Sequence, residues 1–340
     1  MAAVLKRAGK PAGFVSLGFL IFLMAGWGTL ALFYGGEDGG LLRSALAVAY
    51  GLGGLGAIVA LASPPIRWRA FAGFLALFAL VVAWWNMIEA SNDRNWRPEV
   101  ALLPRVTIEG DLVTVHNIRN FDYRSEEDFT PAYYDNTFDL RRLESVDLIA
   151  VYWMGPAIAH TFLSFGFAGG DYLAISIETR KEAGEGYSTL KGFFKQYELF
   201  YVVADERDVI RVRTNYRKDT PEEVYLFRLH GPIENGRRLF MEYMRRINRL
   251  KEEPEYYNTL TTNCTTTIWF NTRVNPGHLP FSWKVLLSGY VPEFLHEAGL
   301  LDPGLSLADL KRRGRINARA QAADRAVDFS RRIRSGEEPS

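Results

Sequence analysis

Three long apolar runs near the N-terminus constrain this chain more than any other feature. They cover residues 13–34, 46–62 and 70–88. Each approaches the ~20 residues that an α-helix needs to cross a hydrocarbon core about 30 Å thick. The second run is short, and it extends back to residue 41 if Arg43 reaches toward the membrane surface. We therefore expect three transmembrane helices within residues 13–90, after a short N-terminal segment, residues 1–12.

Basic residues around these runs predict their orientation, because Lys and Arg are enriched in cytoplasmic loops. The loop GGEDGG after the first run carries two acids and no base, whereas bases precede the first run and follow the second: Lys6, Arg7, Lys10, Arg67 and Arg69. This alternation predicts a cytoplasmic N-terminus and places everything after residue 88 outside the cytoplasm. We expect the first run to be retained, since no small-residue cleavage site is evident before Gly35.

The rest of the chain has a different composition. It holds nearly all of the charged residues, and the formal net charge of the whole protein is +1. No basic face is evident, so we expect no nucleic-acid partner. The spans contain no acidic or histidine residue, which argues against transport. Cys264 is the single cysteine, so an internal disulfide is excluded.

Short β-type segments alternate with a few helical ones, which predicts an α+β domain over residues 105–305. Residues 91–104 are interpreted as a linker. Residues 306–340 form an arginine-rich tail, interpreted either as a solvated surface helix or as a segment lying against anionic lipid. Two hairpins are expected, 105–109 with 112–118 and 160–167 with 172–179, the second turning at Gly169 and Gly170.

The remaining elements are expected from periodicity and end signals. Residues 120–140 are predicted to be irregular. Strands are expected at 147–153, 199–204, 209–214 and 223–229, and helices at 232–250, 283–287 and 292–300.

Cys264 lies where a helix is expected to begin. Thr261, Thr262 and Asn263 are good N-cap residue types, and an apolar stretch follows. A helix start lowers the pKa of a thiol, and its free N–H groups can hold an oxyanion. Cys264 is therefore a candidate nucleophile, with Asn263 and Tyr257 as candidate oxyanion or substrate contacts that equally suit capping and packing.

A nucleophilic thiol needs a base, and the base needs an orienting partner. His160 opens a predicted strand, and a turn at Gly169-Gly170 would place Glu178 or Thr179 opposite it. His160 is our candidate base and Glu178 our candidate orienting residue. A buried structural cysteine and a hydrogen-bonded core histidine are the alternatives. Four other histidines compete as the base: His116, His230, His278 and His296.

Five segments between about residues 106 and 320 carry a family resemblance. They are NIRNFDYRS (117–125), AHTFLSFGF (159–167), SIETRKEAGEGYS (176–188), RTNYR (213–217) and YYNTLTTNCTTT (256–267). Together they resemble the Lnb N-terminal periplasmic domain family. This resemblance implies a circularly permuted relative of the papain and NlpC/P60 folds, in which His160 is the base and Cys264 the nucleophile.

The resemblance also implies an activity, because characterised Lnb proteins are lipoprotein N-acyltransferases. Such an enzyme in the bacterial inner membrane, with its domain in the periplasm, would move an acyl chain from a phospholipid to a lipoprotein amine through a thioester on Cys264. No metal or nucleotide cofactor is implied. This chain departs from those proteins by carrying its membrane helices before the domain. Two other hypotheses stay open: a cysteine peptidase or amidase acting on cell-wall peptide, and a non-catalytic membrane-tethered binding module.

Overall fold

The computed structural model describes residues 2–36, 40–218 and 220–335, with the backbone alone for residues 2–12. The chain forms two compact units: Met1–Ser91 with Tyr187–Tyr197 make unit 1, and Asn92–Gly186 with Glu198–Ser340 make unit 2. Much of the charge pattern that predicts the membrane orientation falls outside the described residues. This applies to the side chains of Lys6, Arg7 and Lys10, and to residues 37–39.

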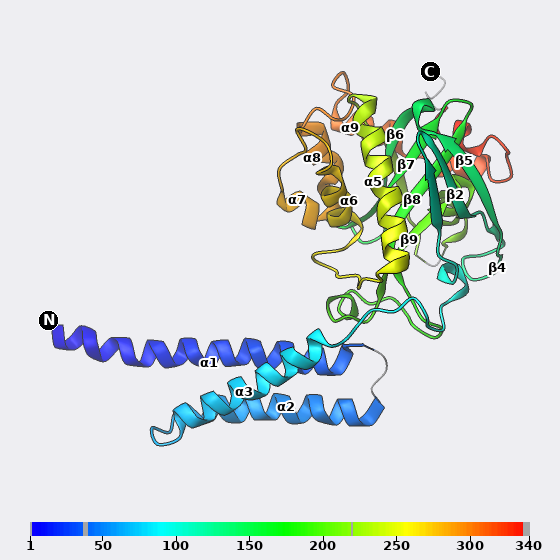
Figure 1. Ribbon diagram of the computed structural model, residues 1–340. Coiled ribbons are helices and arrows are strands. Elements are labelled where there is room, and N and C mark those ends of the chain that lie inside the picture. Colours follow the sequence, from blue (N-terminus) through cyan, green and yellow to red (C-terminus); the bar gives the residue numbers. More distant parts are fainter. Residues whose placement is uncertain (1, 37–39, 219, 336–340) are drawn as a thin grey trace. The chain divides into compact units, whose positions relative to one another are not determined.

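Unit 1 contains three apolar helices, α1 (Ala2–Tyr34), α2 (Gly40–Ala60) and α3 (Arg67–Asn86) (Figure 1). In the described residues, three segments are long and apolar enough to cross a membrane: Gly13–Tyr34, Gly40–Ala60 and Arg67–Asn86. The three expected membrane helices are thus confirmed. The second begins at residue 40, and Arg43 reaches back to donate a hydrogen bond to the carbonyl of Leu32.

Two glycines of α2 allow the helices of unit 1 to approach closely. A Cβ added at Gly54 would lie 2.5 Å from the Cβ of Ala25, and one at Gly51 would lie 3.0 Å from Thr29 Oγ1. Small residues at such crossings favour helix association in lipid.

Unit 2 is organised around one sheet, which has eight strands within the described residues. The strand order is β1-β2-β9-β8-β7-β6-β10, with β5 also paired to β2. All pairs are antiparallel except β2 with β9. The bounds are β1 (Arg105–Glu109), β2 (Leu112–Arg119), β5 (Tyr133–Asp139), β6 (Leu143–Tyr152), β7 (Ala159–Phe167), β8 (Asp171–Arg180), β9 (Glu198–Ala204) and β10 (Glu223–Arg228).

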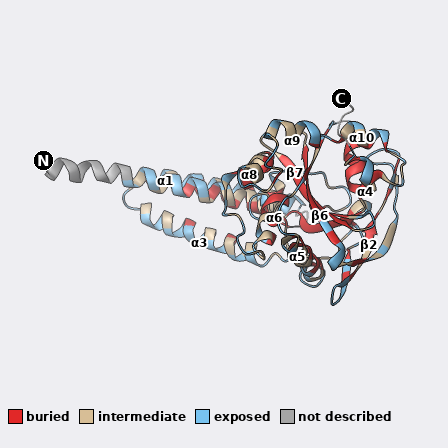
Figure 2. Ribbon diagram, turned by 90° about the horizontal axis from the view of Figure 1, so that it is seen from above, coloured by how far each residue is buried: buried red, intermediate tan, exposed pale blue. Residues whose placement is uncertain are grey.

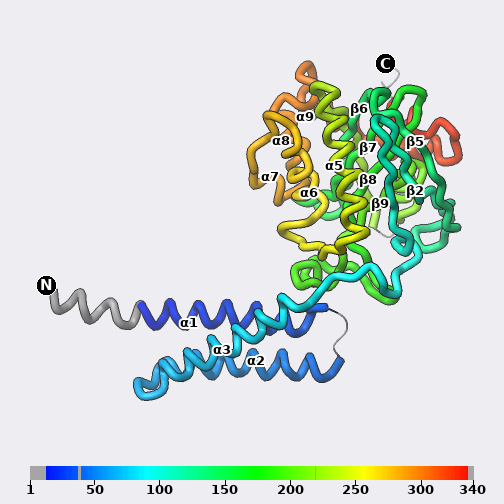
Figure 3. The backbone as a smooth tube through the Cα atoms, in the orientation of Figure 1, coloured from blue at the N-terminus to red at the C-terminus, as the bar shows by residue number. Residues whose placement is uncertain are grey.

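The remaining elements surround this sheet, and Figure 3 follows the chain through them. A short strand pair, β3 (Asp122–Tyr123) with β4 (Phe129–Thr130), is separate from it. The helices are α4 (Glu206–Arg211), α5 (Ile233–Glu252), α6 (Cys264–Thr272), α7 (Trp283–Leu286), α8 (Val291–Glu297), α9 (Leu307–Gly314), α10 (Asn317–Ala322) and α11 (Phe329–Arg332).

Alternate side chains of the strands point to opposite faces of the sheet, so each face has its own covering. On one face, aromatic rings of β7 and β9 contact α5: Phe165 lies against Phe240 and Tyr243, and Tyr201 against Tyr243. Every residue of β7 is buried, as Figure 2 shows by colour.

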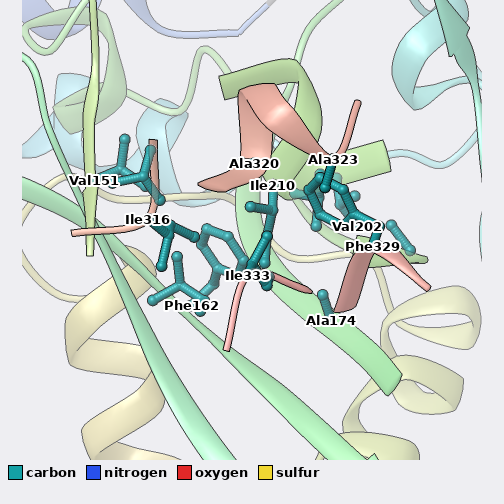
Figure 4. Packing of buried hydrophobic residues seen from close by; sticks show 14 of the residues in the cluster. Val151, Phe162, Ala174, Val202, Ile210, Ile316, Ala320, Ala323, Phe329 and Ile333 are labelled. Atoms are coloured by element: carbon teal, nitrogen blue, oxygen red, sulfur yellow. The ribbon is translucent and has the colours of Figure 1, made fainter. Parts of the chain in front are cut away.

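The opposite face is covered by α4 and the C-terminal segment. Figure 4 shows Phe162, Ala174 and Val202 of the strands among the residues that cover them. Those covering residues are Ile210, Ile316, Ala320, Ala323, Phe329 and Ile333. The arginine-rich tail is therefore part of the core up to residue 335, rather than a solvated or lipid-bound helix. Its apolar residues, interspersed among the arginines, supply the buried contacts.

Three other segments differ from the sequence-based expectation. Residues 209–214, expected as a strand, belong to α4 and a π-helical turn, Val212–Tyr216, because the Asp205 side chain caps a helix start at Glu206. Residues 120–140 are not wholly irregular, since polar edge strand β5 pairs with β2. The expected linker packs into unit 2: Val100 is buried, and Arg94 forms an ion pair with Glu198 at 2.9 Å.

Candidate active site

The hairpin of β7 and β8 brings His160 and Glu178 together. Its backbone pairing runs from Phe167–Asp171 to Leu163–Ile175. Extending this register by three residues on each strand places His160 opposite Glu178 rather than Thr179. Opposite residues share a face of the sheet, and the side chains meet: His160 Nε2 lies 3.0 Å from Glu178 Oε1.

Ser176 links the two groups and determines the histidine tautomer. Its hydroxyl lies 2.7 Å from His160 Nε2 and donates to Glu178 Oε1 at 2.8 Å. A hydroxyl has one proton, so Ser176 must accept from Nε2–H while it donates to the carboxylate. The other ring nitrogen, Nδ1, is then the one left to exchange a proton with a nucleophile.

Cys264 is the first residue of α6, a helix that packs against β7 and β8. Asn263 is the N-cap: its Oδ1 accepts from the N–H groups of Thr265 and Thr266, and Thr266 Oγ1 accepts from the Asn263 N–H in return. This capping box fixes the helix start and the position of the sulfur. Both Cys264 and His160 are buried, with 9% and 8% of their surface exposed.

The thiol and the imidazole are close enough to shift each other's titration. Burial disfavours the imidazolium, but the Glu178 carboxylate and the Cys264 sulfur together outweigh burial and raise the pKa of His160 to about 9. Burial likewise raises the pKa of the Cys264 thiol, whereas the charge of His160 and a hydrogen bond from it lower this pKa to about 7. Between these values the stable state is a thiolate–imidazolium pair.

Two threonines complete the surroundings of the sulfur. The backbone N–H of Thr161 and the hydroxyl of Thr265 hydrogen-bond to Cys264 and lower its pKa further. The two threonine hydroxyls are also 2.9 Å apart, which ties β7 to α6 at the site. His160, Thr161 and Thr265 therefore lower the thiol pKa, and the effect expected from the helix start stays a prediction. The N-cap occupies the helix N–H groups of Thr265 and Thr266.

Glu178 also pairs with Arg213, which contacts the same carboxylate oxygen as His160 and Ser176 and was not among the residues predicted from the sequence. Arg213 Nη2 lies 2.9 Å from Glu178 Oε1, and Nη1 lies 3.3 Å from Glu222 Oε1. Burial raises the pKa of Glu178, but His160 and Arg213 outweigh it and keep this pKa well below its usual value. Ser176 was also missed, although strand alternation places it on the same face as Glu178.

Asn263 and Tyr257, the candidate oxyanion or substrate contacts, are held within the fold. Asn263 is engaged on both sides, because its Nδ2 also donates to the carbonyl of Thr259 at 2.7 Å. Tyr257 is buried, with 7% of its surface exposed. The Cys264 N–H, by contrast, has no acceptor in the part of the chain that the structure describes.

The competing histidines lie elsewhere. His116 pairs with Asp135 at 2.6 Å, and His296 hydrogen-bonds to the carbonyl of Leu305 at 3.1 Å. His230 and His278 are exposed.

A cavity of about 230 Å³ lies along α6. Thr262 and Thr267, on either side of Cys264 in the sequence, line it, and so does Asn271. The distance along the helix axis from Cys264 to Asn271 is about 10 Å. The cavity has both polar and apolar walls, the latter from Leu199, Tyr201, Leu250 and Phe270.

Residues 129–289 match the model of the Lnb N-terminal periplasmic domain family. The match confirms the family expected from the sequence, over a narrower range than 106–320, and it contains Cys264, His160, Glu178 and Arg213. No curated protein and no solved structure matches the chain. With three helices able to span a bilayer, the chain is a membrane protein with an Lnb-type periplasmic domain. The papain-like permutation stays a prediction.

The arrangement in the Lnb domain has the components of nucleophilic catalysis by a thiolate. A sulfur with a lowered pKa faces a histidine, the histidine is oriented by a carboxylate and a hydroxyl, and an N–H without an acceptor adjoins the sulfur. A nucleophile, a base and an orienting group in this order suit acyl transfer.

Proposed function

We propose that this protein is a cysteine acyltransferase of the inner membrane, which moves an acyl chain from a phospholipid to the N-terminal amine of a lipoprotein. The observation that carries the proposal is the order of the two pKa values, about 7 for Cys264 and about 9 for His160. Because the thiol titrates below the imidazole, both groups are charged between these values. The nucleophile therefore needs no outside base to become a thiolate.

The first half-reaction forms a thioester. The Cys264 thiolate attacks the carbonyl carbon of a phospholipid ester, and the Cys264 N–H stabilises the oxyanion, since the helix N–H groups of Thr265 and Thr266 are occupied by Asn263. The carbon–oxygen bond to the glycerol then breaks. His160 gives its Nδ1 proton to the departing alkoxide, and the acyl group stays on sulfur while a lysophospholipid leaves.

The second half-reaction transfers the acyl group to an amine. The neutral N-terminal amine of the acceptor attacks the thioester carbon, and His160 takes the proton that the new amide nitrogen releases. The carbon–sulfur bond breaks, which restores the thiolate–imidazolium pair. Glu178 stays ionised throughout and stabilises the imidazolium, so the cycle consumes one ester and one amine and yields one alcohol and one amide.

The three membrane helices support a lipid donor. A domain tethered to the bilayer meets phospholipid at a high effective concentration without needing a strong separate binding site. The loops' charge pattern supports a cytoplasmic N-terminus. The chain connectivity is also consistent with the proposal. Only residues 179–186 lie in the sequence between Glu178 and Tyr187, where the second segment of unit 1 begins.

The experiment that tests the proposal follows the label through both half-reactions. The full chain, purified in nanodiscs with acyl-labelled phospholipid, should gain the mass of one acyl chain on Cys264. Addition of a diacylated lipopeptide with a free N-terminal amine should then move the label to the peptide. C264A is the control and should gain no label. An unlabelled wild-type thiol, together with cleavage of cell-wall peptide by the same preparation, would instead indicate a peptidase or amidase.

A cellular test examines the acceptor. The wild-type gene should rescue a strain that lacks its lipoprotein N-acyltransferase, and the C264S variant should not. Thioester formation without rescue would retain the cysteine chemistry and reject the lipoprotein acceptor.

A further inference from the structure

The connection between β8 and β9 contains a segment that belongs to unit 1 and not to the sheet. This segment, Tyr187–Tyr197, packs on the ends of α1 and α3. The Gly36 N–H donates to the carbonyl of Lys195 at 3.2 Å, and the ring of Phe194 lies 6.2 Å from those of Tyr34 and Trp85.

Lys195 caps the C-terminal end of α3. Its Nζ donates to the carbonyls of Trp85 and Ile88, both at 2.9 Å. The C-terminal end of a helix is the negative end of its dipole, so a cation there is stabilising. Lys195 has a φ of 50°, in the left-handed region that non-glycine residues seldom adopt. The segment is thus a fixed part of the helix ends.

These helix ends belong at a membrane–water interface. Helices α1 and α3 cross in the same direction, because α2 returns between them, so their C-terminal ends lie on one side of the bilayer. Trp84 and Trp85 lie near the C-terminal end of α3, and tryptophan is enriched at membrane–water interfaces. By its contacts within unit 1, the segment lies at the same level.

The segment exposes several large apolar side chains. Leu190 and Phe193 have 43% and 36% of their surface exposed, and Tyr187 has 54%. Leu190 is the N-cap of a 3₁₀ turn, Lys191–Phe193, and Phe193 is its last residue. Residues three apart in such a turn point to the same side. Two large apolar side chains are therefore presented together, next to lipid-facing helix ends.

We propose that Tyr187–Tyr197 is an interfacial loop that inserts Leu190 and Phe193 into the outer leaflet of the bilayer. The occupant of this apolar surface is lipid, because the surface continues that of the membrane-spanning helices. Strand β8, which bears Ser176 and Glu178, then continues through residues 181–186 into a membrane-held loop. This inference holds whether or not the acyltransferase proposal is correct.

Spin labels can measure the depth of the loop. Cys264 is the only cysteine, so C264S gives a cysteine-free full-length chain into which L190C or F193C is introduced. L77C, 49% exposed on α3, marks the bilayer, and L260C, 50% exposed in unit 2, marks water. Each labelled chain is placed in phospholipid nanodiscs. Collision rates are then measured with oxygen, which partitions into lipid, and with a nickel chelate, which stays in water.

The labels at residues 190 and 193 should collide more with oxygen than with nickel, with a ratio shifted from that at residue 260 toward that at residue 77. A ratio equal to that at residue 260 for either label would overturn the inference. The experiment measures immersion depth in a chain without the nucleophile. A negative result would therefore not bear on the acyltransferase proposal.

Discussion

Two of the buried charge clusters in unit 2 differ in their suitability for chemistry. The first joins Cys264, His160 and Glu178. The second joins Arg334 to two fully buried carboxylates, with Arg334 Nη2 lying 2.7 Å from Asp147 Oδ2 and 2.6 Å from Glu206 Oε1. Its guanidinium carbon also lies 3.7 Å from the ring centroid of Tyr172.

The clusters differ in whether a proton can move near neutral pH. The guanidinium of Arg334 keeps its charge, because the two carboxylates outweigh burial and raise its pKa further. In the cluster around Cys264, the thiol and imidazole pKa values are about 7 and about 9, so small changes redistribute a proton. Buried charge alone does not indicate a functional site. A nucleophile whose pKa lies near neutral pH does indicate one.

Removal of the nucleophile should give the largest functional effect. C264A should lower the rate of acyl transfer by about 10⁴-fold or more, since no other group can carry the acyl chain. The unfolding midpoint should change little, because Cys264 is small and His160 keeps Glu178 as an ion-pair partner after the thiolate is removed. Transfer rates and thermal unfolding are to be measured on the same nanodisc sample. Substantial residual transfer would contradict the covalent mechanism.

The Arg334 cluster should show the opposite behaviour. R334M should lower the free energy of unfolding by about 3–5 kcal/mol, because Asp147 and Glu206 would stay buried without their shared cation. The matched control is R331M, since the Arg331 side chain is 80% exposed. Any R334M protein that remains folded should keep the thiol pKa of the wild type. A selective loss of transfer without loss of stability would remove the distinction between the clusters.

Neutralising Glu178 should weaken the thiolate without unfolding the domain. The carboxylate raises the pKa of His160, so E178Q should lower that pKa, and the thiol pKa should rise as the imidazolium is lost. An upward shift of one to two units leaves about 10- to 100-fold less thiolate at pH values below the wild-type thiol pKa. The rate of iodoacetamide alkylation against pH measures this.

The control for Glu178 is E144Q, which alters an exposed carboxylate of β6. If E178Q and E144Q give the same alkylation profile as the wild type, Glu178 does not tune the pair.

Local signals were sufficient to predict much of the site. The Gly169-Gly170 turn sets the register that brings Glu178 to His160, and the Asn263 side chain predicts the helix start at Cys264. Arg213 was missed because the alternation in residues 209–214 resembles a strand, whereas the capped start at Asp205 makes this segment helical. The burial of the tail depends on contacts such as that between Asp147 and Arg334, which no local pattern reveals.

Asn263 gives the smallest expected effect and separates two origins of the low thiol pKa. N263A should lower the free energy of unfolding by about 1 kcal/mol through loss of the N-cap, and N263S, which keeps an acceptor, should recover most of it. The thiol pKa should stay near 7, because His160 and Thr161 lower it directly. Alkylation against pH, measured beside thermal unfolding, decides the matter. A clear rise in the thiol pKa of N263A that N263S reverses would assign the activation of Cys264 to the helix start instead of to the imidazolium.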